Sequence, residues 1–297
     1  MLGALLSWGA FVVALALAGV SAAAVTASTG PGAWRAATAK VVPALVTLAV
    51  TVPLVLLVQR RRREVLALAR PGQVFVGAGV VLLAAAVVLV PAAMAGAITV
   101  TAVDPSGLVV FLLTNTALAL ALEAVPEELA FRGSVYGSLR RRTRPWVAAA
   151  WTTLSFVVAP AASIALTAGL GRLLHLPTPP PTFAPGGQDP VAYAVLLAVF
   201  GAVLLLARAA TGSTWAAVGV HIGFLTVNRL ALPGGFDTGV VVDAVAGAEL
   251  VVLAYLLLAG LGLLLLRRRR RARGRSGAAR QTGPDVDTTS ERVRRLG

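Results

Sequence analysis

The pattern of hydrophobic and polar residues along the chain consists of long apolar stretches separated by short polar breaks. A helix needs about 20 apolar residues to cross the ~30 Å hydrocarbon core of a bilayer. Eight stretches meet this requirement, so the pattern predicts an all-α fold, a polytopic transmembrane helix bundle of about eight spans. The predicted spans are residues 2–26, 41–59, 72–100, 107–138, 146–170, 190–210, 213–231 and 239–266.

Composition supports a membrane protein. Hydrophobic residues make up 58% of the 297 residues and charged residues only 13%, whereas about a quarter of the residues in a soluble domain are charged. A soluble domain has no means of covering so much apolar surface. We therefore assign residues 1–266 to a transmembrane helical domain, and we expect the polar segment 267–297 to be a disordered basic tail.

The net charge of +14 would indicate a nucleic-acid partner in a soluble protein. Here the arginines stand in blocks at the edges of apolar stretches, so we read them as topology signals, with the lipid bilayer as the partner and no nucleic acid. The basic tail is either a stop-transfer anchor or a segment attracted to anionic lipid headgroups. The blocks that mark one side are Arg60–Arg63, Arg140–Arg142, Arg208 and Arg267–Arg271.

These blocks alternate correctly with eight spans if both ends of the chain are cytoplasmic. The sequence thus predicts a multi-pass protein of the cell membrane with an N-in, C-in orientation. The chain has no cysteine, which excludes disulfides and thiolate chemistry.

Ionisable residues inside a span are costly and mark candidate functional sites. The fourth span concentrates them, because it contains Glu123, Glu127, Glu128 and Arg132. Glu123 and Glu127 are four residues apart and share a helix face, and the same spacing allows Glu128 and Arg132 to pair. Pro126 removes a backbone donor beside them, which favours a kink and a wet pocket.

The pair of Glu128 and Arg132 has a simpler interpretation, as two charges that only neutralise each other in the core. That interpretation leaves Glu127 unexplained, because its nearest opposite charge in the sequence is already engaged. Gly133 and Gly137 allow another helix to approach closely, and inside a bundle we expect that helix to belong to the same chain.

The segment Glu127-Glu128-Leu-Ala-Phe131-Arg132-Gly133 closely resembles the first motif of the CPBP intramembrane protease family, also called the CAAX-protease or Abi family. That family has about eight helices, with the acidic motif on a middle span and a histidine on a penultimate span. His221 occupies the corresponding place, and the resemblance covers roughly residues 107–230. It implies that Glu127 activates water, that Glu128 and Arg132 order the pocket, and that His221 stabilises the oxyanion.

Two positions depart from the family pattern. Pro160 stands where the second motif, F-x-x-x-H beginning at Phe156, has its histidine. Leu225 stands where the third motif has a polar residue four positions after His221. Asn228 lies on nearly the same face as His221 but ~10 Å further along a helix, so we do not expect it to serve as the replacement.

Depth in the membrane decides which histidine joins the site. Glu127 and His221 are each 13 residues from the arginines at 140 and 208, or ~20 Å of helix, so they can meet at one depth. His175, the other histidine of the chain, falls at the opposite side. A catalytic zinc takes three protein ligands, which Glu123, Glu127 and His221 offer in principle. In the alternative interpretation, His221 is a packing residue that bonds to the carbonyl of a neighbouring helix.

Three functions follow from these residues. The resemblance implies an endopeptidase that cleaves a membrane-associated or prenylated peptide near the cytoplasmic face. The departures at Pro160 and Leu225 favour a non-catalytic member that acts as a membrane scaffold or immunity-type factor. A small transporter that uses Glu123 and Glu127 as a proton site is the third hypothesis.

Overall fold

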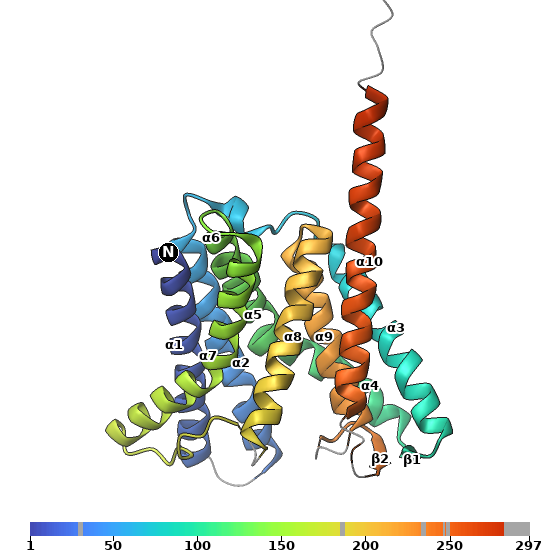
Figure 1. The fold of residues 1–297 in the computed structure, drawn as a ribbon. Helices are drawn as coiled ribbons and strands as arrows, with labels where there is room; N and C mark the ends of the chain where they lie inside the picture. Colours follow the sequence, from blue (N-terminus) through green and yellow to red (C-terminus); the bar gives the residue numbers. More distant parts are fainter. Residues whose placement is uncertain (29–31, 185–187, 233–235, 246, 248–249, 282–297) are drawn as a thin grey trace, which may run out of the picture.

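The computed structural model describes residues 1–28, 32–184, 188–232, 236–245, 247 and 250–281. Within these residues the chain forms a bundle of long helices, which confirms the all-α fold class (Figure 1). Seven are α1 (Leu2–Ser28), α2 (Ala33–Val58), α3 (Gln73–Met94), α7 (Pro145–Leu173), α8 (Pro190–Thr211), α9 (Thr214–Ala231) and α10 (Leu250–Gln281), and the eighth runs continuously from Pro105 to Arg140.

The helix from Pro105 to Arg140 is irregular in its middle, where the candidate site lies. It consists of α4 (Pro105–Ala119), α5 (Val125–Glu128) and α6 (Tyr136–Arg140), joined by π-helical turns at Leu120–Ala124 and Leu129–Val135. Pro126 has no N–H for an α-helical bond, and the N–H of Val125 donates to the carbonyl of Leu120, five residues back. The helix therefore widens into π-helical turns instead of ending. Such turns inside α-helices are common at functional sites.

In the part of the chain that the structure describes, seven helices are long and apolar enough to cross a membrane. They correspond to seven of the eight predicted spans, and the chain is a multi-pass membrane protein. The eighth prediction corresponds to α9, which has only 18 residues and is less apolar because it contains His221, Asn228 and Arg229. Most of α9 is buried by other helices, so its polar residues face protein and not lipid.

Two predicted span ends are wrong. Residues 98–100 and 239–244 were expected in transmembrane helices, but the structure has β1 (Ile98–Val103) and β2 (Val240–Ala244) there. The two strands pair antiparallel, with an irregularity between Val100 and Ala102. Both segments are rich in β-branched residues, which favour extended backbone, and each can satisfy its hydrogen bonds with the other outside the helical bundle.

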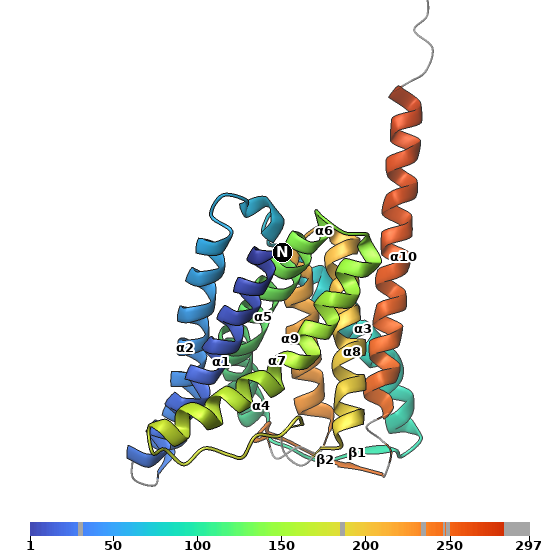
Figure 2. The same ribbon diagram turned by 60° about the vertical axis from the view of Figure 1, so that its left-hand side comes forward.

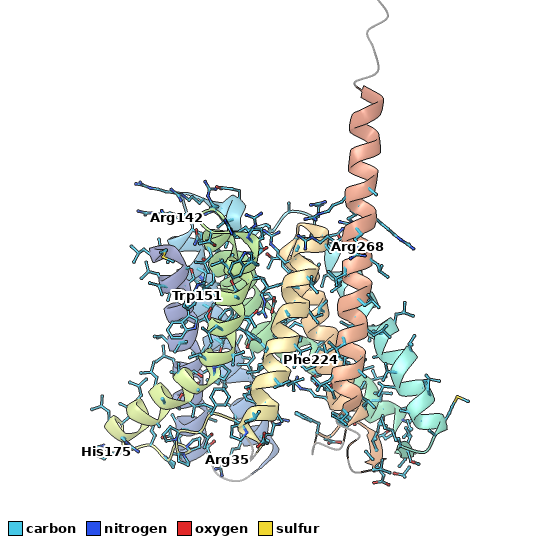
Figure 3. All side chains as sticks on the ribbon, in the orientation of Figure 1. Arg35, Arg142, Trp151, His175, Phe224 and Arg268 are labelled. Atoms are coloured by element: carbon cyan, nitrogen blue, oxygen red, sulfur yellow. The ribbon has the colours of Figure 1, made fainter. Side chains whose placement is uncertain are left out.

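The two ends of the bundle carry different residues. The start of α1, Arg142 and Arg268 lie at one end, whereas Arg35 and His175 lie at the other (Figures 1 and 3). The beginning of the chain and the arginine block of α10 therefore share a side, as the predicted topology requires. The β1–β2 pair lies at the end opposite the arginines (Figure 2).

Helices α7 and α10 each have a part that extends away from the bundle. Pro160 lies inside α7, and the last part of this helix runs obliquely away from the bundle (Figures 1 and 2). Helix α10 continues to Gln281 and projects beyond the other helices, so the expectation of disorder is wrong for residues 267–281. Arginine is a good helix former, and a helix already begun in the membrane extends at little cost. Residues 282–297 lie outside the described residues.

Close helix contacts at glycines set the position of α9. A Cβ atom at Gly77 of α3 would collide with the backbone carbonyl of Ala216, and one at Gly219 of α9 would collide with that of Val74. Gly133 and Gly137 similarly face Leu66 and Val65, in the short 3-10 helix Arg63–Leu66. The expectation that these two glycines serve packing within the chain is confirmed.

Candidate active site

A fully buried ion pair forms the base of the candidate site. Nη1 of Arg132 lies 3.1 Å from Oε1 of Glu128, one helical turn earlier, and neither side chain is exposed. The guanidinium also lies over the ring of Phe156 at 4.1 Å, and its Nη2 donates to the carbonyl of Gly201 in α8. The predicted pairing of Glu128 with Arg132 is confirmed. It ties the irregular helix to α7 and α8.

His221 joins this pair from α9. Its Nδ1 atom lies 3.0 Å from the same Oε1 atom of Glu128 that contacts Arg132. The ring of Phe200 packs against the imidazole edge-to-face, with the ring centres 5.0 Å apart. The interpretation of His221 as a packing residue bonded to a helix carbonyl is therefore wrong, because its partner is a carboxylate of the acidic motif.

Glu127 is placed differently from Glu128. Within the described residues its carboxylate accepts no hydrogen bond, and its nearest charged neighbour is Nε2 of His221, 4.0 Å from its Oε2. Its side chain is 16% exposed, whereas that of Glu128 is fully buried. Thus Glu128 has two close partners, whereas the adjacent Glu127 has, among the described residues, only the longer contact with His221.

The carboxylate of Glu127 faces a cavity of about 220 Å³. Both His221 and Glu123 line it, and so does Pro160, the residue at the place of the family's second histidine. The wall also includes Gln188 and Tyr193, where α8 begins, near the end of the bundle that holds His175. His175 itself follows α7 at that far end and takes no part in the site, as predicted (Figure 3).

Glu123 has a partner that its sequence position did not reveal. Its Oε1 accepts from Nη2 of Arg229 at 2.7 Å, and Nη1 of Arg229 donates to Oδ1 of Asn115 at 2.6 Å. The amide of Asn115 in turn donates to Thr226. The sequence did contain a signal for this contact, because Arg229 is eight residues after His221 and falls on the same face of α9.

The third-motif region also shows a contact that the sequence did not predict. Leu225, at the position of the family's polar residue, lines the cavity, and so does Asn228 one turn later. The hydroxyl of Tyr255 in α10 donates to Oδ1 of Asn228 at 2.6 Å. Asn228 is therefore held at the cavity wall by another helix, and it makes no hydrogen bond to His221.

Among the described residues, Glu127, Glu128 and His221 form a group that offers metal ligands, with one ligand atom of each within 4.8 Å of the others. Glu123, which the sequence suggested as a third ligand, is engaged by Arg229. Glu128 already contacts a guanidinium and the Nδ1 atom of His221, and its free oxygen, Oε2, is buried. This donor set fits a zinc ion poorly, because an open catalytic site needs three ligands free of other cations.

Residues 105–227 match the family model for type II CAAX prenyl endopeptidase Rce1-like proteins. The matched segment contains Glu127, Glu128, Arg132 and His221, the four residues that the structure brings together. The resemblance to the CPBP intramembrane protease family is confirmed over this segment. No curated protein and no solved structure matches the chain.

Proposed function

We propose that the chain is an intramembrane endopeptidase in which Glu127 activates the attacking water. The observation that carries this proposal is the contrast between the two adjacent carboxylates. Glu128 is held by Arg132 and His221, whereas Glu127 faces a cavity with Nε2 of His221 4.0 Å away. A water molecule can lie within hydrogen-bonding distance, about 2.8 Å, of both facing atoms.

The charges of the four residues suit this reaction. With Glu128 paired to Arg132, a protonated His221 balances the charge of Glu127. Water attacks the scissile carbonyl carbon as Glu127 takes its proton, and Nε2–H of His221 donates to the oxyanion. Collapse of the tetrahedral intermediate breaks the C–N bond, and Glu127 returns the proton to the leaving amine.

Residues in the surrounding shell would position these groups. The edge-to-face ring of Phe200 fixes the imidazole plane, and the contact with Glu128 fixes which nitrogen faces Glu127. The substrate class we propose is a membrane-associated or prenylated peptide. We place the protein in the cell membrane with both ends cytoplasmic, and cleavage near the cytoplasmic face stays a prediction.

A non-catalytic scaffold is the second candidate, and one observation favours it. Pro160 and Leu225 both line the cavity, so the two departures from the family pattern lie in the site itself. A scaffold would use the same cavity to bind a membrane peptide without cleaving it. The transporter hypothesis is weakened, because Arg229 engages Glu123, one of its two proposed proton carriers.

Purified protein incubated with a library of membrane peptides separates the two candidates. Cleavage by the wild type that is lost in Glu127→Gln supports the endopeptidase. Peptide binding without cleavage in both proteins supports the scaffold. Cleavage that persists unchanged in Glu127→Gln contradicts the role we give Glu127.

A further inference from the structure

A second hollow lies on the outside of the bundle, between α7 and α8. This apolar groove has a volume of about 1040 Å³ and shares no lining residue with the Glu127 cavity. It follows α8 from Pro190 to Ala209, or ~28 Å at 1.5 Å per residue. Its walls include large apolar side chains that the protein leaves exposed, among them Trp146, Leu154 and Val195.

At the arginine-rich end, the groove runs into a polar hollow. This basic pocket has a volume of about 380 Å³, and it shares Tyr136, Ala209 and Arg267 with the groove. Arg140, Arg141 and Arg208 complete its cationic wall. The two hollows therefore form one continuous surface that is apolar along its length and basic at one end.

Among the described residues, three of the four arginines that line the basic pocket have no partner. Within the described residues, the guanidinium groups of Arg140, Arg208 and Arg267 make no hydrogen bond or ion pair, and Nε of Arg208 is buried without an acceptor. The pocket's acidic residue, Glu64, is engaged by Arg141 at 3.1 Å. Unsatisfied buried donors are costly, so this arrangement calls for an anionic acceptor from outside the chain.

We propose that the groove and the basic pocket together bind an anionic phospholipid. Its phosphate accepts hydrogen bonds from Arg208, Arg267 and Arg140, and its acyl chains fill the groove between α7 and α8. The phosphate supplies the charge that the pocket lacks, and the apolar groove distinguishes a lipid from a free anion. A lipid bound there packs against the face of α8 opposite the Glu127 cavity.

Binding of a fluorescent acyl-labelled phosphatidylglycerol to the full-length protein in neutral detergent tests this site. Unlabelled phosphatidylglycerol should compete, whereas phosphatidylcholine and soluble glycerol phosphate should compete at least tenfold less well. The double variant Arg208→Gln/Arg267→Gln should weaken binding by roughly tenfold or more, because each basic residue near an anionic headgroup contributes to the free energy of binding. The matched control is Arg61→Gln, an exposed arginine at the same end of the bundle that lines neither hollow.

Several results would overturn the proposal. Equal competition by phosphatidylcholine would show a general lipid-facing groove, and equal competition by glycerol phosphate would show a site for free anions. An equal loss in Arg61→Gln would show only a diffuse attraction to basic charge. Wild-type protein that carries a polypeptide in the groove and excludes phosphatidylglycerol would show a protein-binding site instead. The double variant is compared only after its melting temperature confirms folding.

Discussion

The Nδ1 atom of His221 and the Oε1 atom of Glu128 lie 3.0 Å apart, although the residues are 93 positions apart in the chain. This contact makes the position of the histidine dependent on the acidic motif. Because Nη1 of Arg132 contacts the same oxygen, a substitution that moves the ion pair also moves the hydrogen-bond partner of the imidazole. The packing of the site is therefore coupled through Glu128, while Glu127 meets this network only at Nε2 of His221, 4.0 Å from its Oε2.

Replacement of Arg132 by alanine should strongly destabilise the protein. It leaves the fully buried carboxylate of Glu128 without its guanidinium partner, which typically costs ~3–5 kcal/mol. Unfolding of the purified variant by a denaturing detergent would measure this loss. The double variant Glu128→Leu/Arg132→Met removes both charges and should recover much of the stability. A single variant as stable as the wild type would contradict the buried pair.

The crossing of α3 and α9 supports a second prediction. Gly77→Ala adds a methyl group where the backbone of α9 already lies, so it should separate the two helices and displace His221, at ~1–3 kcal/mol of stability. The matched control is Gly79→Ala in the same helix, where an added Cβ atom meets nothing within 4 Å. Thermal unfolding of both proteins measures the difference. Equal melting temperatures would show that the close crossing is absent.

Much of this arrangement could be predicted from the sequence. The helices could be predicted because lipid forces each span to be apolar and to satisfy its own hydrogen bonds. The pairing of Glu128 with Arg132 could be predicted because it needs only the geometry of one helix. The partners of Glu123 and Asn228 come from Arg229 and Tyr255 on other helices, and one sequence does not specify which helices meet.

The β1–β2 pair could not be predicted for a related reason. Val-rich segments such as 98–103 and 240–244 read equally well as the end of a membrane helix or as a strand. The decision depends on whether a pairing partner is nearby. These two segments are about 140 residues apart in the chain, and only the folded bundle places them side by side.

Restoring the family's second histidine is a third prediction. Pro160 lines the cavity of Glu127, so Pro160→His should place an imidazole there and raise any peptidase activity. The same change removes the proline inside α7. The increase should depend on Glu127, and it is measured as the cleavage rate of one selected peptide. An equal increase in Pro160→His/Glu127→Gln would show that the new histidine acts without Glu127.

Orientation in the membrane gives a fourth prediction, which the absence of native cysteines makes simple to test. Thr143→Cys lies at the arginine-rich end, and Thr182→Cys lies in the connection between α7 and α8 at the other end. A membrane-impermeant thiol reagent should label Thr182→Cys in intact cells, and Thr143→Cys only after permeabilisation. The reverse pattern would contradict the N-in, C-in orientation.

The role of Glu127 is tested most directly by the cleavage rate of a selected membrane peptide. Glu127→Gln keeps the size of the side chain but removes its basicity. It should lower kcat by about 10²–10⁴-fold, the usual contribution of a general base, while the melting temperature stays near that of the wild type. The control Asp243→Asn changes an exposed carboxylate of β2 that lies outside the cavity, the groove and the basic pocket, and it should leave the rate unchanged. A folded Glu127→Gln protein that cleaves at the wild-type rate would contradict this account.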